Sequence, residues 1–332
     1  MYKNKTILIT GGTGSFGRKF TLTLLKKFKD IKKLIIFSRD ELKQFEMSNQ
    51  YKNTNYYNKL RFFIGDIRDR QRLDMALRDV DIVIHAAALK HVPSSEYNPF
   101  ETIKTNVIGT QNVIESCIEN NVAKLISLST DKASSPVNLY GASKLLADKI
   151  SVSTEYIKGK TKITSAVVRY GNVMASRGSI IPILLSKKNQ RTINLTDKNM
   201  TRFNISLDEA IDLVLLSLRK ASGGEIFVPK LKSYRLIDVA KTIAPNAKLN
   251  FIGIRPGEKI HEEMISFTES ANTIEYKNYF IILPSFRDYK ISDYIKKNGG
   301  KKIAKRFSYS SDKNKKYLTT SELKKLIQNI QN

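Results

Sequence analysis

The sequence predicts an α/β protein in which a doubly wound parallel sheet carries a smaller C-terminal lobe. Three observations point to this fold class. Short β-branched runs alternate with longer helical patterns through the first half of the chain, and a glycine-rich segment follows the first of these runs directly. The regular alternation then fades after Asn172. Parallel strands that are linked by amphipathic helices have this rhythm.

Each expected element can be placed by residue number. We expect strands at 6–10, 34–37, 61–64, 81–87, 124–129 and 165–170, and helices at 15–28, 69–77, 99–120, 140–156 and 206–220. Residues 254–259, IRPGEK, form a compact loop. We therefore assign residues 1–172 to the sheet domain and 173–332 predominantly to a substrate-binding lobe, with excursions of the chain back to the sheet.

Composition narrows the classes of function. The chain has 332 residues and is 41% hydrophobic, which is enough for a well-buried core. A net charge of +26 raises the question of nucleic acid, but the lysines are scattered and no basic motif is interleaved with aromatic residues. We expect no nucleic-acid partner. The more densely basic residues 295–325 leave open a weak contact with a membrane or a polyanion.

Other features point to a soluble protein of a reducing compartment. Cys117 is the only cysteine, so no internal disulfide can form, and three scattered histidines give no metal-ligand spacing. There is no charged leader, and no stretch approaches the roughly 18 apolar residues of a membrane span. We expect a cytoplasmic protein without membrane insertion and without a metal.

The glycine-rich segment 10–17, TGGTGSFG, predicts a dinucleotide site of the Rossmann type. Gly11 permits a tight turn, Gly14 lets the backbone approach a pyrophosphate, and Gly17 lets helix and strand pack closely. The expected contacts in this loop are Gly11, Thr13, Gly14, Ser15, Phe16 and Gly17.

The end of the second strand indicates which dinucleotide is bound. Arg39 follows Ser38 at the position where an NAD site usually presents an acidic residue, so Arg39 would face the 2′-phosphate of NADP. Two alternatives stay open: Asp40 could bind the ribose diol of NAD, or Arg39 could be merely solvated. The further expected cofactor contacts are Ser38, Arg39, Lys43, Asp66, Ile67, Ala86, Ala87, Ala88 and Lys90, together with Tyr140 and Lys144.

Two pairs of residues within 129–144, STDKASSPVNLYGASK, carry the chemistry. Tyr140 and Lys144 are four positions apart, so they share a helix face, where the ammonium can lower the pKa of the phenol from about 10 toward neutrality. A tyrosinate is a base for an alcohol. Asp131 and Lys132 add a second proton donor and acceptor, which simple oxidation does not need. The combination predicts an elimination.

These segments together resemble the extended short-chain dehydrogenase/reductases that act on nucleotide-sugars. The resemblance extends in order and spacing to the inverting UDP-N-acetylglucosamine 4,6-dehydratases that open pseudaminic acid synthesis, and it covers nearly the whole chain. The matching segments are SRDELKQ, GDIRD, AAALKHVP, NVIGT, STDK, NLYGASK, VVRYGNV, SRGS, MTRF, GGEIFVPK, IGIRPGEK and YSSD. The resemblance implies bound NADP, UDP-N-acetylglucosamine as substrate, a role in flagellin glycosylation, and a homo-oligomer, either a dimer through the helices at 99–120 and 140–156 or a hexamer.

The resemblance also implies a role for each catalytic residue. Tyr140 would take the proton of the sugar 4-hydroxyl, Lys132 would remove and later return the C5 proton, and Asp131 would protonate the departing 6-hydroxyl. Thr130 would hydrogen-bond the 4-oxygen. This assignment needs a neutral Lys132 and a protonated Asp131, whereas adjacent opposite charges favour the reverse. We therefore expect the two side chains to diverge, with desolvation or nearby cations lowering the pKa of Lys132.

The implied substrate-binding residues lie mostly in the second half. They are Lys90, Asn172, Arg177, Gly178, Ser179, Ile180, Ile181, Thr196, Met200, Arg202, Arg255 and Glu258. Thr196, Met200 and Arg202 would line the uridine side, Arg255 would hold the pyrophosphate, and Glu258 the ribose. For Arg202, a structural ion pair is the open alternative.

Four positions depart from the family pattern and put the exact sugar in doubt. They are Ser94, Ser95, Ala175 and Asn204.

Three other functions compete with this prediction. A retaining 4,6-dehydratase often has methionine where Tyr140 stands and is commonly membrane-anchored. A nucleotide-sugar 4-epimerase would not need Asp131 and Lys132. A redox-sensing scaffold without turnover would not need an intact Tyr140 and Lys144 pair.

Overall fold

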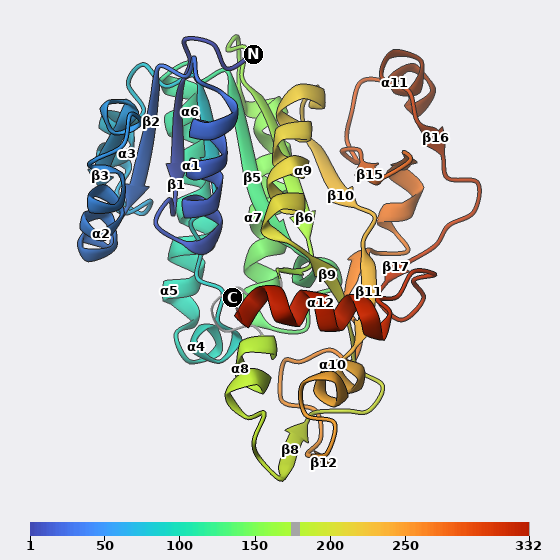
Figure 1. The fold of residues 1–332 in the computed structure, drawn as a ribbon. Coiled ribbons are helices and arrows are strands. Elements are labelled where there is room, and N and C mark those ends of the chain that lie inside the picture. The colour runs from blue at the N-terminus through green and yellow to red at the C-terminus, as the bar shows by residue number, and fades with distance from the viewer. Residues whose placement is uncertain (174–179, 332) are drawn as a thin grey trace.

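The structure, a computed structural model, describes residues 1–173 and 180–331. Its centre is a ten-stranded sheet in the order β16-β14-β15-β10-β6-β5-β4-β1-β2-β3, with helices on both faces (Figure 1). Neighbouring strands from β3 to β10 are all parallel, and β1 lies between β2 and β4. The predicted doubly wound α/β fold is confirmed. In such a sheet, ligands bind beyond the carboxyl ends of the strands where the strand order reverses, here at β1 and β4.

Six parallel strands lie close to their predicted positions. They are β1 (Thr6–Thr10), β2 (Lys33–Ser38), β3 (Leu60–Ile64), β4 (Ile82–His85), β5 (Lys124–Thr130) and β6 (Thr164–Tyr170). The seventh parallel strand, β10 (Glu225–Pro229), was not predicted. The antiparallel edge consists of β14 (Thr273–Glu275), β15 (Tyr279–Ile282) and β16 (Lys301–Lys302). Four strands from beyond residue 172 therefore belong to the main sheet.

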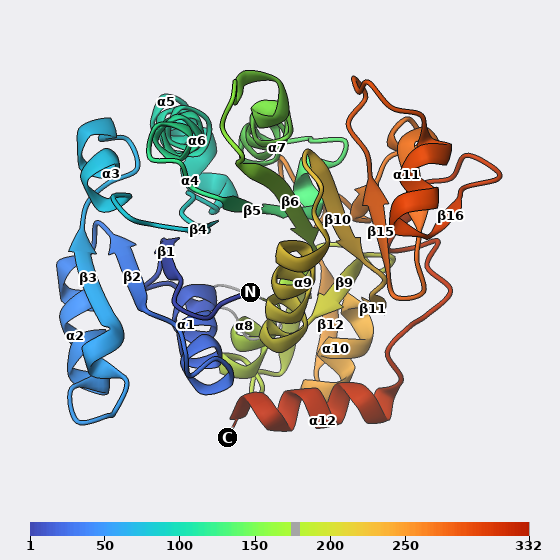
Figure 2. The same ribbon diagram turned by 90° about the horizontal axis from the view of Figure 1, so that it is seen from above.

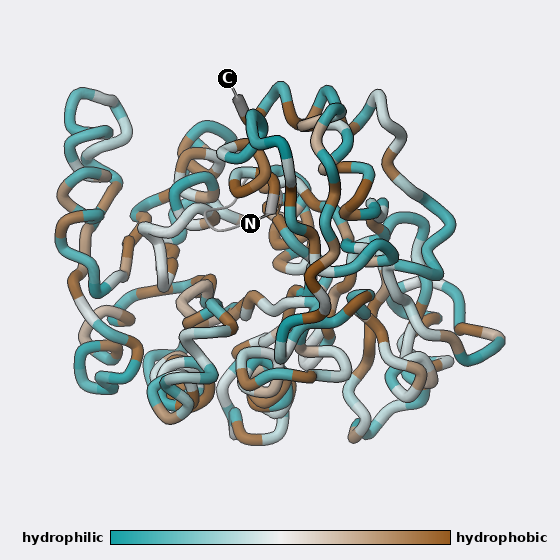
Figure 3. The backbone as a smooth tube through the Cα atoms, turned by 90° about the horizontal axis from the view of Figure 1, so that it is seen from below, coloured by the Kyte–Doolittle hydropathy of each residue, from teal (hydrophilic) through white to brown (hydrophobic). Residues whose placement is uncertain are grey.

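Helices cover the sheet in two layers, which Figure 2 shows from above. One face carries α1 (Ser15–Lys27), α2 (Glu41–Tyr51) and α9 (Leu207–Lys220), and the other carries α3 (Arg70–Ala76), α6 (Gly109–Glu119) and α7 (Leu139–Ile157). Alternating residues of each strand feed the two interfaces: Ile7 and Ile9 of β1 pack on the α1 and α9 side, and Leu8 packs on the α3 and α6 side. In Figure 3, hydrophobic and hydrophilic segments accordingly alternate along the helices.

One helical prediction needs correction. The helix expected at 99–120 consists of α5 (Pro99–Ile103), a π-helical segment η2 (Lys104–Ile108) and α6. The π segment carries Asn106, whose amide bonds both backbone groups of Leu89, at 2.8 Å each. Helix α2 was not predicted, because its apolar Leu42 and Phe45 are exposed and blur the amphipathic pattern.

A smaller lobe lies below the carboxyl ends of the strands in Figure 1. It contains α8 (Ile180–Ser186), α10 (Leu236–Ile243), α12 (Thr320–Gln331) and the parallel pair β8 (Thr192–Leu195) and β12 (Lys248–Phe251). A three-stranded sheet joins it to the main sheet and consists of β7 (Asn172–Val173), β9 (Thr201–Ile205) and β11 (Lys232–Arg235). Placed in this way, the lobe can cover the end of the main sheet where a ligand would bind.

Short elements complete the chain. They are η1 (Tyr57–Lys59), α4 (Val92–Tyr97), η3 (Asp131–Ala133), β13 (Glu263–Ile265), η4 (Glu269–Asn272), α11 (Ile291–Asn298) and β17 (Tyr309–Ser310). Among the described residues, no helix is both long and apolar enough to cross a membrane.

Candidate active site

The glycine-rich loop between β1 and α1 has a shape that side chains would block. Gly11 has a φ of +64°, and a Cβ there would lie 2.9 Å from the Cα of Ala87. A Cβ on Gly17 would lie 2.4 Å from the carbonyl oxygen of Gly12. Helix α1 starts directly after the exposed Gly14, so the free N–H groups of its first turn are open to an anion. The loop therefore fits the pyrophosphate of a dinucleotide.

Arg39 and Asp40, at the end of β2, differ in their contacts. Asp40 caps α2 by accepting the N–H of Lys43 at 3.0 Å, and it also pairs with the ammonium of Lys43. Ser38 is buried and bonds the hydroxyl of Thr13 at 2.8 Å. Arg39 is exposed, with Nη1 3.6 Å from Oδ2 of Asp66. The carboxylate of Asp40 is thus engaged in capping, and Arg39 is the residue presented at the strand end.

Arg39 and Lys90 line the same pocket of about 400 Å³. The pocket lies between the end of β2 and the helices α4 and α5, and its other lining residues are Arg68, Leu89, His91, Ser94, Ser95, Asn98, Glu101, Thr102 and Thr105. Of the predicted cofactor residues nearby, Asp66 accepts the Arg68 guanidinium at 2.7 Å, and Ile67 is buried in the core. Arg39 and Lys90, which are 51 positions apart in the sequence, thus line the same pocket.

Buried hydroxyls fix the segment that follows β4. The hydroxyl of Thr10 accepts the N–H groups of Ala86 and Ala87 at 3.1 and 3.2 Å. The ring of His85 lies between Thr10 and Thr110, at 2.8 and 3.0 Å, and burial lowers its pKa to about 3. Ala86 and Ala87 are half-buried and Ala88 is exposed, so small residues border the glycine loop.

Helix α7 carries Tyr140 and Lys144 on one face. Asn138 caps the helix by accepting the N–H of Gly141 at 2.8 Å, and Lys144 donates to the carbonyl of Leu128 at 2.7 Å. Burial lowers the pKa of Lys144. Burial also raises the pKa of Tyr140 to about 12, against the opposing effects of Lys132 and Thr130. The predicted lowering of the Tyr140 pKa by Lys144 is therefore wrong for this structure, because desolvation outweighs the charges.

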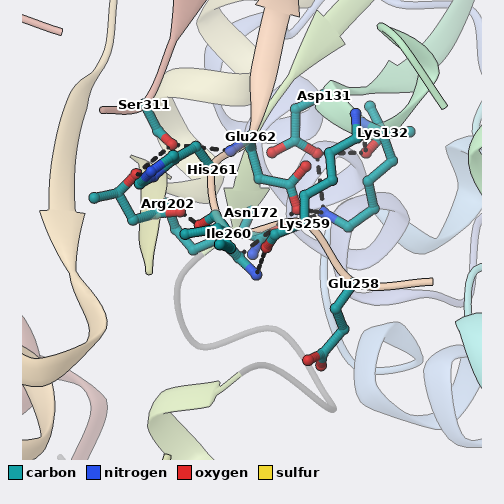
Figure 4. A network of polar contacts seen from close by, with 12 residues as sticks. Asp131, Lys132, Asn172, Arg202, Glu258, Lys259, Ile260, His261, Glu262 and Ser311 are labelled. Carbon is teal, nitrogen blue, oxygen red and sulfur yellow. Dashed lines mark hydrogen bonds and ion pairs between the residues drawn. The ribbon is translucent and has the colours of Figure 1, made fainter. Parts of the chain in front are cut away.

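Asp131 and Lys132 meet at the end of β5 (Figure 4). Oδ1 of the fully buried Asp131 accepts the hydroxyl of Thr130 at 2.9 Å and the ammonium of Lys132 at 3.0 Å. Nζ of Lys132 also contacts Oδ1 of Asn172 and Oε1 of Glu262, each at 3.0 Å. The expectation that Asp131 and Lys132 diverge is wrong, since the 3₁₀ turn η3 folds one side chain back onto the other.

The protonation states are only partly those that were expected. Burial raises the pKa of Asp131, as an acid in this position requires. Burial alone would lower the pKa of Lys132, but the carboxylates of Asp131 and Glu262 outweigh it and raise the pKa above its ordinary value. The expected lowering of the Lys132 pKa is therefore also wrong.

Glu262 is the site residue that sequence reasoning missed. It is 2% exposed and forms ion pairs with Lys132 at 3.0 Å and with Nε of Arg202 at 3.7 Å. Burial would raise its pKa, but Lys132 and Arg202 hold the pKa below the ordinary value. No motif marks Glu262 in the sequence. The one available signal was indirect: a buried Lys132 needs a counterion besides Asp131.

Arg202 braces the segment that carries Glu262. Its guanidinium donates to the carbonyls of Thr201, Lys259 and Ile260 at 2.7 to 3.0 Å. These bonds occupy the planar end of the side chain, so the structure favours the structural alternative for this arginine.

The remaining predicted substrate residues divide into three groups. Arg255 is exposed and lies 4.0 Å from the half-buried Glu258, in a loop that Asn138 holds by a 2.7 Å bond to the carbonyl of Gly257. The side chains of Ile181, Thr196 and Met200 are buried in the smaller lobe. Ile180 begins α8, whereas Arg177, Gly178 and Ser179 lie outside the described residues, as does Ala175, one of the positions that depart from the family pattern.

A second buried network of ion pairs and hydrogen bonds fixes α7, the helix that carries Tyr140 and Lys144. Asp148 lies one turn after Lys144 on α7 and pairs with the fully buried Arg169 of β6 at 3.1 Å. Arg169 also bonds Glu269 at 2.9 Å and the carbonyl of Met264 at 3.0 Å. An arginine that directly follows Ala166, Val167 and Val168 in a strand was the signal for this network, and sequence reasoning did not use it.

Within the two described ranges, no three His, Cys, Asp or Glu side chains are grouped in a way that could hold a metal ion.

Comparison with known proteins confirms the resemblance that the motifs indicate. The family model of the polysaccharide biosynthesis protein matches residues 7–284. A UDP-N-acetylglucosamine 4,6-dehydratase (inverting) of Campylobacter jejuni subsp. jejuni serotype O:23/36 (strain 81-176) is 50% identical over 98% of both chains. A UDP-glucose 4-epimerase of Rickettsia bellii (strain OSU 85-389) is 42% identical over 99% of this chain and 97% of its own.

A solved structure agrees over the whole length. The X-ray structure of Pen from Bacillus thuringiensis is 38% identical, has a TM-score of 0.88, and is matched over 100% of this chain and 99% of its own. By its sequence and by its fold, the chain belongs to the family of polysaccharide biosynthesis proteins.

Proposed function

We propose that the chain is a configuration-inverting UDP-N-acetylglucosamine 4,6-dehydratase. It would convert UDP-N-acetylglucosamine to a UDP-4-keto-6-deoxy-N-acetylhexosamine with inversion at C5. The observation that carries this proposal is the hydrogen-bonded pair of Asp131 and Lys132 close to Tyr140. The name of the Campylobacter relative, at 50% identity, supports the same reaction.

The nicotinamide dinucleotide that this reaction needs fits the glycine loop. When bound, it supplies an acceptor for the C4 hydride and returns that hydride to C6. Thr13, Gly14 and Ser15 would hold the pyrophosphate, and Ala86, Ala87 and Ala88 would border the cofactor. Lys90 would contact both cofactor and sugar from the pocket that it shares with Arg39.

We favour NADP over NAD. Arg39 is exposed at the end of β2 and can offer its guanidinium to a 2′-phosphate. Asp40, the alternative ligand for a ribose diol, is engaged in capping α2.

Tyr140 would accept the first proton, from the sugar 4-hydroxyl. The phenol of Tyr140 must lose its proton to act as a base, and burial alone opposes this. The positive charges of Lys132 and Lys144 would favour the tyrosinate once substrate and cofactor are in place. Thr130 would hydrogen-bond the 4-oxygen.

Lys132 and Asp131 would catalyse the elimination. A C4 ketone acidifies the C5 hydrogen, so Lys132 could remove that proton while Asp131 gives its own proton to the departing 6-hydroxyl. Acid and base must then act on groups that adjacent carbons carry, which suits two side chains that lie 3.0 Å apart. Return of a proton to C5 on the opposite face would produce the inversion.

The sugar nucleotide would lie between the catalytic turn and the loop of residues 254–259. Arg255 is exposed and would pair with the diphosphate, and Glu258 would accept the ribose hydroxyls. Asn172, already bonded to Lys132, would contact the sugar. In this assignment, residues 1–172 bind the cofactor and residues 173–332 predominantly bind the substrate.

We propose a cytoplasmic homo-oligomer that acts in pseudaminic acid synthesis for flagellin glycosylation. Exposed apolar side chains on the η2–α6 and α7 helices, Ile108, Leu146 and Ile157, are candidates for a two-fold interface. Light scattering on the purified protein would measure the number of subunits.

The test of the proposed function is direct. The protein is incubated with UDP-N-acetylglucosamine and NADP, and the sugar nucleotide is followed by mass spectrometry. Loss of one water supports the dehydratase. A sugar of unchanged mass that has been epimerised at C4 supports the activity named for the Rickettsia relative and overturns the proposal.

A further inference from the structure

The ammonium of Lys132 has three acceptors for its three protons. Nζ lies 3.0 Å from Oδ1 of Asp131, from Oδ1 of Asn172 and from Oε1 of Glu262 (Figure 4). The three oxygens come from the catalytic turn, from β7 and from the segment before β13. Each N–H of the ammonium can therefore donate to a different acceptor.

Opposite charges are paired inside this cluster. Asp131 and Glu262 are 0% and 2% exposed, and together they carry two negative charges. Lys132 pairs with both carboxylates, and Arg202 pairs with that of Glu262. A proton that passes from Lys132 to Asp131 leaves both groups neutral, which costs less than leaving an unpaired charge in a buried site.

One oxygen of each carboxylate is buried without a hydrogen-bond partner in the part of the chain that the structure describes. These oxygens are Oδ2 of Asp131 and Oε2 of Glu262. An unpartnered buried carboxylate oxygen is costly when charged, and protonation relieves that cost. Glu262 is held ionised by two cations, so Asp131 is the better place for an additional proton.

We propose that Glu262 is a positioning residue for the elimination: with Asn172 it holds the two remaining N–H groups of Lys132 after the third proton has passed to Asp131. The amine is then neutral, and the hydrogen bonds to Asn172 and Glu262 fix the direction in which its lone pair points. The inference rests on the proposed dehydratase function and assigns to it a residue that lies outside the matching segments named above.

The proton balance closes over one elimination. Lys132 gives a proton to Asp131, which leaves a neutral amine and a neutral carboxylic acid. The amine takes the C5 proton, the C5–H electrons form the C5–C6 double bond, and the C6–O bond breaks. Asp131 gives its proton to the departing hydroxyl, which leaves as water. Lys132 is again an ammonium and Asp131 again a carboxylate.

Several charged and titratable groups surround this proton. Tyr140 faces Lys132 from α7, Arg202 from β9, Tyr234 from β11, and Lys259 and Glu262 from the segment before β13. Of these, Glu262 raises the pKa values of both Asp131 and Lys132. Removing its charge therefore moves both pKa values down.

The experiment compares three variants of the full-length holoenzyme. Glu262→Ala removes the acceptor, and Glu262→Gln keeps an acceptor oxygen but removes the charge. Glu263→Gln is the matched control, because Glu263 is adjacent in the chain but bonds the hydroxyls of Ser134 and Ser135 instead. C4 oxidation is followed by nicotinamide absorbance after rapid mixing with UDP-N-acetylglucosamine, and C5 chemistry by deuterium uptake from heavy water.

The expected result separates the two steps. In Glu262→Ala, C5 exchange slows by about 100-fold, the cost of a misplaced catalytic base, while C4 oxidation slows by less than about threefold. Reduced nicotinamide therefore accumulates. In Glu262→Gln, C5 exchange persists, and both limbs of its pH profile move to lower pH. Glu263→Gln resembles the parent protein in each respect.

Three results would overturn the inference. The first is C5 exchange in Glu262→Ala within about twofold of the parent, well short of the loss expected for a positioned base. The second is equal slowing of both steps, which indicates a structural role alone. The third is an unmoved pH profile in Glu262→Gln, which decides the matter even if the alanine variant does not fold. A parent protein that forms no dehydrated sugar would instead refute the proposed function.

Discussion

Lys144 donates to the backbone carbonyl of Leu128 at 2.7 Å, and this bond fixes the catalytic helix to the end of β5. Leu128 lies three residues before Asp131, and Lys144 lies one turn after Tyr140. The lysine therefore sets the distance between the two halves of the chemistry, the phenol on α7 and the acid and base pair in η3. Its role in this structure is to hold the two parts together as well as to supply charge.

Replacing Tyr140 by Phe should abolish C4 oxidation with little effect on folding. The phenol is the proposed base for the 4-hydroxyl, and loss of such a base typically slows a reaction by about 10²- to 10⁴-fold. The measurement is the single-turnover change in nicotinamide absorbance. Tyr97→Phe, at an 87% exposed position, is the control and should react at the parent rate. A fully active Tyr140→Phe would remove the tyrosine from the mechanism.

Replacing Arg39 by Ala should change the choice of cofactor. The exposed guanidinium is the proposed partner of the 2′-phosphate, so the affinity for NADP should fall by about tenfold or more, whereas that for NAD should hardly change. Fluorescence titration with each dinucleotide measures both affinities. Arg72→Ala is a suitable comparison, because Arg72 lies nearby over the ring of Phe63. Equal losses for both dinucleotides in Arg39→Ala would contradict the preference for NADP.

Replacing Arg169 by Met should destabilise the fold strongly. The change leaves Asp148 and Glu269 without their buried counterion, which typically costs about 3–5 kcal/mol of unfolding free energy. Urea unfolding measures the loss. Arg235→Ala breaks an exposed pair with Asp238 and should cost less than about 1 kcal/mol. Similar losses in the two variants would show that the buried network contributes no more than a surface pair.

His85 should make the protein less stable in acid. Its pKa is about 3 in the folded state against 6.5 ordinarily, so the unfolded chain binds the additional proton between these values. Stability from this group is full above pH 6.5 and falls as the pH is lowered toward 3. Between pH 7 and pH 5 the loss is about 2 kcal/mol.

Urea unfolding of the parent and of His85→Gln at both pH values isolates this effect. The variant lacks the titrating ring, so its stability should fall less between pH 7 and pH 5. If the two proteins lose the same free energy, His85 is not the group responsible.

The sequence was sufficient for the six strands from β1 to β6, because these strands are short, buried and separated by helices of regular period. It did not place the other four strands of the sheet, which come from beyond residue 172. The glycine loop could be predicted for a related reason: Gly11 and Gly17 occupy positions that no side chain could share. Helix α2 escaped prediction, since Leu42 and Phe45 are exposed on its surface. The π segment was missed because its amino-acid pattern is that of an ordinary helix.

The protonation states of the site depend on contacts between distant parts of the chain. Glu262 lies 130 positions from Lys132 in the sequence, and no local pattern indicates that the two side chains meet. The pKa of Tyr140 follows from burial, which appears only when the helix is packed. The directions for both Lys132 and Tyr140 were therefore wrong when they were argued from nearby residues alone.

The most direct test of the central claim is the fate of C5. The parent protein is incubated with UDP-N-acetylglucosamine in deuterated water, and the sugar is examined by NMR and mass spectrometry. The account predicts loss of one water, one deuterium at C5, and inverted configuration at that carbon. Lys132→Ala should form none of this product. A dehydrated sugar with retained C5 configuration would contradict the inversion, and a sugar that keeps its 6-hydroxyl would contradict the elimination itself.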